Sequence, residues 1–199
     1  MADLYAIVGS MERARVMLEA QVPVLQLRFK EISLEENREE IASWPSKYPT
    51  TKLIINDDLF FAVSVGAYGV HLGQEDLARY TNKTLRTTSI NLGISTHSTE
   101  EIEMALRYNP VMIGFGPIFP TQTKFVGHRP QGEYRLAEIV AETPLPVIAI
   151  GGIDETNLDR VIGSNVAMVA MISHLDKYPT PSDVKVLIQR LRRPLDPSS

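Results

Sequence analysis

The sequence contains no cysteine, so disulfide bonds and thiolate metal sites are excluded. It has no apolar run near the roughly 20 residues of a membrane helix and no signal-peptide pattern at its start. An excess of positive charge is also missing, because 20 Lys and Arg face 24 Asp and Glu, a net charge of -4. These absences predict a cytoplasmic protein with no nucleic-acid partner and no membrane partner.

What is present is typical of a globular protein. Hydrophobic residues make up 44% of the 199 residues and charged residues 22%, which excludes a disordered or fibrous chain. A chain of this length buries roughly 70% of its unfolded surface, so one core is sufficient. We expect a single domain over residues 1–199, with a frayed tail over 191–199.

Short apolar runs rich in β-branched residues alternate with stretches of helical periodicity. The predicted strands are 4–8, 24–28, 52–55, 69–72, 91–95, 112–115, 147–150 and 167–171. The predicted helices are 11–20, 34–42, 58–65, a weak one after Leu77, 99–107, 135–140, 155–162 and 182–191. Eight such units in about 200 residues predict an α/β fold, a single-domain (β/α)8 TIM barrel. An open doubly wound sheet is the alternative, but the first turn, Gly9-Ser10-Met11, lacks its glycine pattern.

Several residues are expected to end or begin helices. Ser98 three residues before Glu101 resembles a capping box, and Asp154 precedes a predicted helix. Asp58 favours a helix cap over a metal ligand. Gly66 and Gly163 stand where helices should end.

The catalytic groups of a parallel barrel come from the carboxyl ends of its strands. A period of two after the second strand directs Gln26, Arg28 and Lys30 to one side. Asp57 follows the third strand and Asp76 the fourth, and carboxylates from adjacent loops are suited to Mg2+. Cations beside carboxylates predict a site for a metal and a diphosphate.

A second anion site is expected at loops seven and eight, which carry Gly151-Gly152 and Ile172-Ser173. Gly151-Gly152 could also be only a tight turn. His71 is interpreted as an interior hydrogen-bonding residue that could face a ligand. His97 could be either a cap partner or a site residue.

Seven segments, taken in order, resemble the thiamine-phosphate synthase family over nearly the whole chain. They are QLRFK (26–30), IINDD (54–58), GVHLGQED (69–76), GISTHS (93–98), GPIFPTQTK (116–124), IGGI (150–153) and MIS (171–173). LGQED and GPIFPTQTK in this order are the most specific.

The resemblance implies a role for each matching residue. Asp57 and Asp76 would hold Mg2+, and Arg28, Lys30, Ser95 and Lys124 would be catalytic. The substrate-binding residues would be Gln26, Leu27, Arg28, Phe29, Lys30, Asn56, Ser95, Thr121, Gln122, Thr123, Lys124, Gly152, Ile172 and Ser173. Within this set, Ser95 would contact the pyrimidine amino group, and Gly152, Ile172 and Ser173 would hold the thiazole phosphate.

The implied reaction joins a pyrimidine diphosphate to a thiazole phosphate and releases pyrophosphate by a dissociative mechanism. We expect small-molecule partners and a monomer or small homo-oligomer. A thiazole tautomerase of the same barrel family and a non-catalytic sensor of thiamine precursors are the alternatives. The tautomerase has histidine where this chain has Pro117. The family commonly has aspartate near Gly9-Ser10, longer first helices, a shorter loop at 125–132 and Ala-Gly-Ala-Asp at 163–166.

Overall fold

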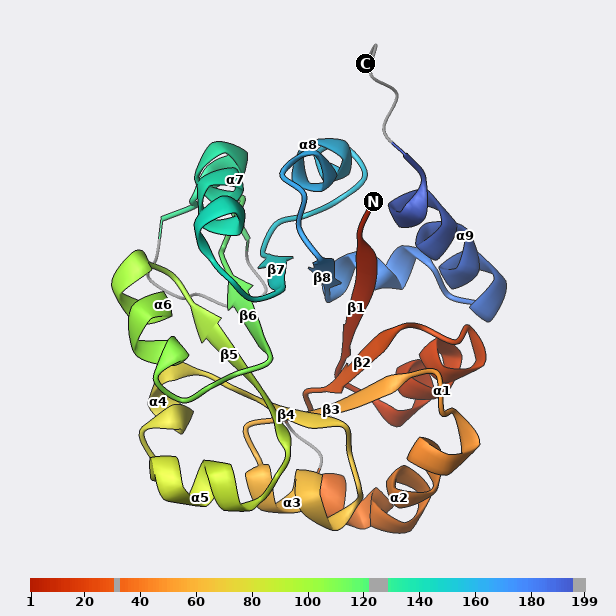
Figure 1. Ribbon diagram of the computed structural model, residues 1–199. Coiled ribbons are helices and arrows are strands. Elements are labelled where there is room, and N and C mark those ends of the chain that lie inside the picture. The colour runs from red at the N-terminus through yellow and green to blue at the C-terminus, as the bar shows by residue number, and fades with distance from the viewer. Residues whose placement is uncertain (31–32, 122–128, 195–199) are drawn as a thin grey trace.

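The computed structural model describes residues 1–30, 33–121 and 129–194. Its eight parallel strands form a closed barrel in chain order, with β1 hydrogen-bonded to both β2 and β8 (Figure 1). The strands are β1 (Asp3–Val8), β2 (Val24–Leu27), β3 (Lys52–Asn56), β4 (Gly69–Leu72), β5 (Asn91–Thr96), β6 (Met112–Phe115), β7 (Val147–Ile150) and β8 (Met168–Met171). The TIM-barrel prediction is confirmed, and each predicted strand overlaps an observed one.

Helices form a ring outside the strands (Figure 1). They are α1 (Met11–Glu19), η1 (Leu34–Asn37), α2 (Arg38–Lys47), α3 (Leu59–Ser64), α4 (Gln74–Leu77), α5 (Asn82–Thr87), α6 (Thr99–Leu106), α7 (Gly132–Glu142), α8 (Leu158–Gly163), η2 (Ser173–Lys177) and α9 (Pro181–Arg192). The weak helix expected after Leu77 is two short ones, α4 and α5. None of the helices described is long and apolar enough to span a bilayer.

Side chains alternate along each strand between two apolar layers, one outside the barrel and one inside it. Along β1, Leu4, Ala6 and Val8 pack outward against the helices, whereas Tyr5 and Ile7 point into the barrel. The interior layer consists of Tyr5, Ile7, Val24, Ile54, Met112, Ile148 and Ala170. This layer fills the barrel below its mouth.

Side-chain hydrogen bonds at the helix starts show which of the predicted caps are present. Ser98 Oγ accepts from Glu101 N at 3.3 Å, and Asp58 Oδ1 accepts from Phe61 N at 2.9 Å, so both residues are N-caps as expected. The capping box at Ser98 is only half formed, because the Glu101 carboxylate accepts from His97 N at 2.7 Å. The cap at Asp154 was wrong: α8 begins at Leu158, and Asp154 Oδ1 instead accepts from Thr156 N at 2.8 Å in the preceding turn.

The ends of two helices show where left-handed residues are needed. Gly66 has φ 64° after α3, as expected of a helix-ending glycine. Gly163 does end α8, but the left-handed residue is Asn165, with φ 58°. Asparagine tolerates this conformation, and the turn into β8 is made there.

The expected frayed tail over 191–199 was wrong for residues 191 and 192. Helix α9 continues to Arg192, and Leu191 is fully buried. The Ala2 amide donates to Leu191 O at 3.0 Å, which ties α9 to the start of β1. Residues 195–199 lie outside the described part of the chain.

Candidate active site

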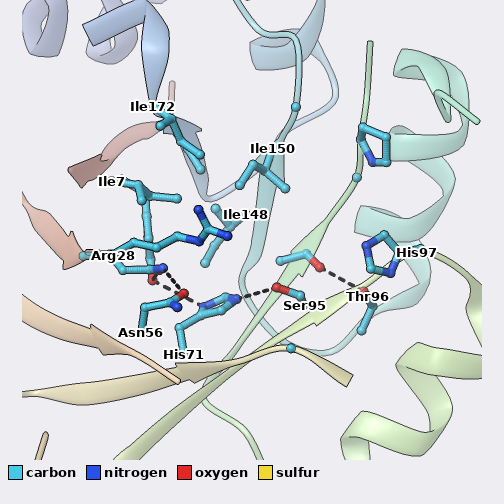
Figure 2. Close-up of a pocket in the computed structure, with 18 of the residues that line it drawn as sticks. Ile7, Arg28, Asn56, His71, Ser95, Thr96, His97, Ile148, Ile150 and Ile172 are labelled. Carbon is cyan, nitrogen blue, oxygen red and sulfur yellow. Dashed lines mark hydrogen bonds between the residues drawn. The ribbon is translucent and has the colours of Figure 1, made fainter. Parts of the chain in front are cut away.

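A pocket of about 160 Å³ opens at the carboxyl ends of the strands. The sequence-predicted residues that line it are Gln26, Arg28, Asn56, Asp57, Asp76, Ser95, Thr121 and Ile172. Figure 2 shows the Arg28 side chain extending toward the middle of this group. The closure of the barrel therefore brings together residues that are far apart in the sequence.

An acidic pair stands at one side of the pocket. Asp57 follows β3 in a left-handed conformation, with φ 65°, and its amide donates to His71 O at 2.9 Å. Burial, the charge of Asp76 and a hydrogen bond between the two carboxyl groups together raise the pKa of Asp57 to about 6. The Arg28 charge acts in the opposite direction. Asp76 also pairs with Arg79 at 3.0 Å.

A hydrogen-bonded chain crosses the barrel interior beneath the pocket. The Tyr5 hydroxyl donates to Gln26 Oε1 at 2.7 Å, and Gln26 Nε2 donates to Asn56 Oδ1 at 2.8 Å. Tyr5 also lies 3.3 Å from His71 Nδ1. On the other side of the ring, His71 Nε2 lies 2.9 Å from Ser95 Oγ, and Figure 2 shows these two side chains pointing toward each other. Sequence reasoning missed Tyr5, although its inward position on β1 was a readable signal.

The opposite side of the mouth forms a smaller cavity between loops seven and eight, of about 60 Å³. Gly151 and Gly152 have φ of 100° and 65°, and a Cβ on Gly152 would lie 2.5 Å from Pro120 O. Phe119 N donates to Gly151 O at 3.0 Å. The two glycines thus make a tight turn and also line this cavity, together with Ile172 and Ser173.

Three predicted residues of the second strand do not line the main pocket. Leu27 is fully buried in the outer layer, and Phe29 borders a neighbouring groove beside Asp58. Lys30 is exposed, because β2 ends at Leu27 and the period of two does not continue to residue 30. Gln122, Thr123 and Lys124 lie outside the described residues.

His97 fits both interpretations that the sequence left open. Its backbone amide donates to Glu101 Oε2 at 2.7 Å, and its Nδ1 lies 2.9 Å from the same oxygen. The ring also lines the main pocket. His97 is therefore a cap partner whose ring forms part of the wall.

Residues 4–175 match the family model described as thiamine monophosphate synthase. The chain belongs to this family. Two thiamine-phosphate synthases illustrate the similarity. That of Neisseria meningitidis serogroup A is 38% identical over 190 residues, covering 94% of this chain and 93% of the relative. That of Escherichia coli O6:H1 is 39% identical over 173 residues, covering 85% and 82%.

Solved structures agree with the thiamine monophosphate synthase assignment. The thiamine phosphate pyrophosphorylase from Pyrococcus furiosus superposes with a TM-score of 0.79 at 25% identity, covering 96% of this chain and 97% of that one. A 3-hexulose-6-phosphate synthase from Salmonella typhimurium gives 0.66 at 11% identity, covering 96% and 100%. The second similarity shows the barrel alone.

Proposed function

We propose that this chain is a thiamine-phosphate synthase that joins an aminopyrimidine methyl diphosphate to a thiazole phosphate and releases pyrophosphate. The observation that carries the proposal is the acidic pair Asp57 and Asp76 beside Arg28, in one pocket with Ser95. A second small cavity at Gly152 and Ser173 adjoins it. The two adjoining cavities would offer a place for each of two anionic substrates.

The acidic pair fits Mg2+. Besides burial, the closeness of Asp76 raises the pKa of Asp57, because two negative charges repel each other. A bound cation would reduce this repulsion. Among the residues described, no cluster of three or more His, Cys, Asp or Glu could hold a metal. Mg2+ commonly takes one or two carboxylates and completes its octahedron with water and substrate phosphate. Mg2+ held by Asp57 and Asp76 would supply positive charge to the departing pyrophosphate.

The residues of the pocket would act by position and charge. Arg28 would bind the diphosphate and stabilise the negative charge that develops when the carbon–oxygen bond breaks and the electron pair leaves with pyrophosphate. Ser95 would hold the pyrimidine amino group, whose nitrogen donates electron density to the remaining methylene cation. The thiazole nitrogen would then form the new bond to that carbon.

The thiazole phosphate would lie against the small cavity. Gly152, Ile172 and Ser173 line this cavity, and their backbone amides would bind the phosphate. Thr121 lines both cavities. Binding by Leu27, Phe29, Lys30, Gln122, Thr123 and Lys124 stays a prediction from the sequence. The subunit number and the cytoplasmic location also stay predictions.

The test is pyrophosphate release by the purified chain given both substrates, with Mg2+ or with EDTA. We expect release to require Mg2+ and both substrates, and to be lost in Asp57→Ala. Asp58→Ala is the matched control, because Asp58 caps α3 and should leave the Mg2+ requirement unchanged. Thiazole phosphate binding without any pyrophosphate release would favour the tautomerase or the sensor instead.

A further inference from the structure

Asp57 fixes the direction of the hydrogen bonds inside the barrel. Asn56 Nδ2 donates to Asp57 Oδ2 at 2.5 Å. The Asn56 oxygen then faces Gln26, which donates from Nε2 at 2.8 Å. The Gln26 oxygen is thereby turned toward Tyr5. Each amide has one donor end and one acceptor end, so the direction set at Asp57 is passed inward.

The same direction continues through Tyr5. Burial raises the pKa of its phenol, so Tyr5 keeps its single proton and donates it to Gln26 Oε1 at 2.7 Å. The Tyr5 oxygen is then an acceptor toward His71 Nδ1, 3.3 Å away. This direction is satisfied when His71 carries its proton on Nδ1.

The surroundings of the His71 ring favour its neutral form. The residue is 8% exposed, and its ring partners are the uncharged Tyr5 and Ser95 hydroxyls. A neutral ring with its proton on Nδ1 has a bare Nε2, which can only accept. The Ser95 hydroxyl, 2.9 Å away, then donates its proton to His71 Nε2.

We propose that this chain of hydrogen bonds makes Ser95 Oγ an acceptor toward the pocket, so that the site selects a pyrimidine with an amino group over one with a carbonyl at the same position. The proposal deepens the proposed function and rests on it. Tyr5 and His71 are positioning residues, because they act on the ligand through Ser95. An amino group would donate to Ser95 Oγ, whereas a carbonyl would present a second acceptor to it.

Two glycines leave the space that the His71 ring occupies. A Cβ on Gly93 of β5 would lie 2.7 Å from His71 Nδ1, and a Cβ on Gly114 of β6 would lie 3.3 Å from His71 Cε1. The ring therefore lies directly against backbone that carries no side chains. Its edge-to-face contact with Tyr5, at 6.2 Å between centroids, fixes the other side.

The first experiment measures the tautomer of His71 by 15N NMR of the free protein at neutral pH. We expect the proton on Nδ1, which is assigned from the two nitrogen shifts. A proton on Nε2 would overturn the proposal, since Ser95 would then accept from His71 and donate to the ligand. This measurement needs no substrate. It therefore tests the direction of the hydrogen bonds even if the protein releases no pyrophosphate.

The second experiment compares the affinities of thiamine phosphate and its 4-oxo analogue by calorimetry. We expect the amino compound to bind on the order of 100-fold more tightly, the usual range when a site built for one hydrogen bond meets the wrong group. In Tyr5→Phe, His71 Nδ1 loses its acceptor, the proton can move to Nε2, and Ser95 can donate. The ratio should then fall below about tenfold.

The matched control is Tyr178→Phe, which removes a hydroxyl bound to exposed Glu155 and should leave the ratio unchanged. A Tyr5→Phe variant that folds and keeps the wild-type ratio would overturn the proposal. If Tyr5→Phe does not fold, the His71 tautomer of the wild-type protein decides. If neither ligand binds the wild type, the proposed function fails, and the tautomer still judges the direction of the chain.

Discussion

Gly93→Ala is expected to damage both stability and activity through His71. The added Cβ would lie 2.7 Å from His71 Nδ1 and 3.2 Å from Met112 Cγ, whereas ordinary contacts begin at 3.4 Å. The ring must therefore move by about 0.7 Å, the difference between those values. Gly114 backs the ring at 3.3 Å, so the displacement strains the bonds to Ser95 and Tyr5.

Two effects contribute to the loss of stability in Gly93→Ala. Overpacking of a filled interior costs about 1–3 kcal/mol, and weakening one buried hydrogen bond costs about 1 kcal/mol. We expect the free energy of unfolding to fall by about 2–4 kcal/mol. Because Ser95 would no longer be held in place, kcat/KM should fall by about 10- to 100-fold, with pyrophosphate release as the assay.

Alanine variants at three glycines test whether the loss depends on the contact with the His71 ring. Gly114→Ala, with its closest approach at 3.3 Å, should cost less than Gly93→Ala. Gly9→Ala, which approaches Arg28 O at 3.7 Å and is exposed, should leave denaturant unfolding nearly unchanged. Equal stability and equal kcat/KM in Gly93→Ala and Gly9→Ala would refute the role given to the His71 ring.

Three further predictions concern other parts of the barrel. Because the pKa of Asp57 rises from 3.8 to about 6 on folding, the folded state binds more protons across this window, and its stability falls as pH rises through it. Without metal, Asp57→Asn should therefore raise Tm at pH 7.5 and give no gain near pH 4; a loss of Tm at pH 7.5 would contradict this. Gly152→Ala forces a Cβ to 2.5 Å from Pro120 O at φ 65°, so calorimetry should show weakened thiazole phosphate binding, and unchanged affinity would contradict it. Leu191→Ala should cost about 2–5 kcal/mol in urea unfolding, because Leu191 is fully buried, whereas exposed Val186→Ala should cost less than about 0.5 kcal/mol.

The strands could be predicted because each is a short, nearly continuous apolar run. Gly69–Leu72, Met112–Phe115 and Val147–Ile150 match their predictions residue for residue. In a barrel with helices on one side and a filled interior on the other, both faces of each strand are buried, so the signal does not depend on alternation. The carboxyl ends of the strands then gave the approximate place of the pocket.

The errors have a common physical cause. Lys30 was predicted to face the pocket because the alternation of a strand was extended to residue 30. The strand β2 ends at Leu27, so the alternation does not hold there. Asp154 was expected to cap a helix that begins four residues later. Such boundaries depend on local hydrogen bonds, such as Asp154 N to Asn157 Oδ1 at 3.0 Å, that composition does not determine.

The interior polar chain was hidden for a different reason. Tyr5 is 21 residues from Gln26 and 66 from His71, so only closure of the barrel brings the three together. The register places His71 opposite Gly93 and Ser95 opposite Gly114. Once the strand order is known, the pattern of one histidine facing glycines on later strands becomes readable.

The pairing of β1 with both β2 and β8 has a consequence for synthesis on the ribosome. The edge of β1 that belongs to β8 has no partner until Met168–Met171 has emerged from the exit tunnel. Until then the nascent sheet is open at two edges, a state prone to pairing with other chains. The pairing of β8 with β1 closes both edges, and α9 then ties Leu191 to Ala2.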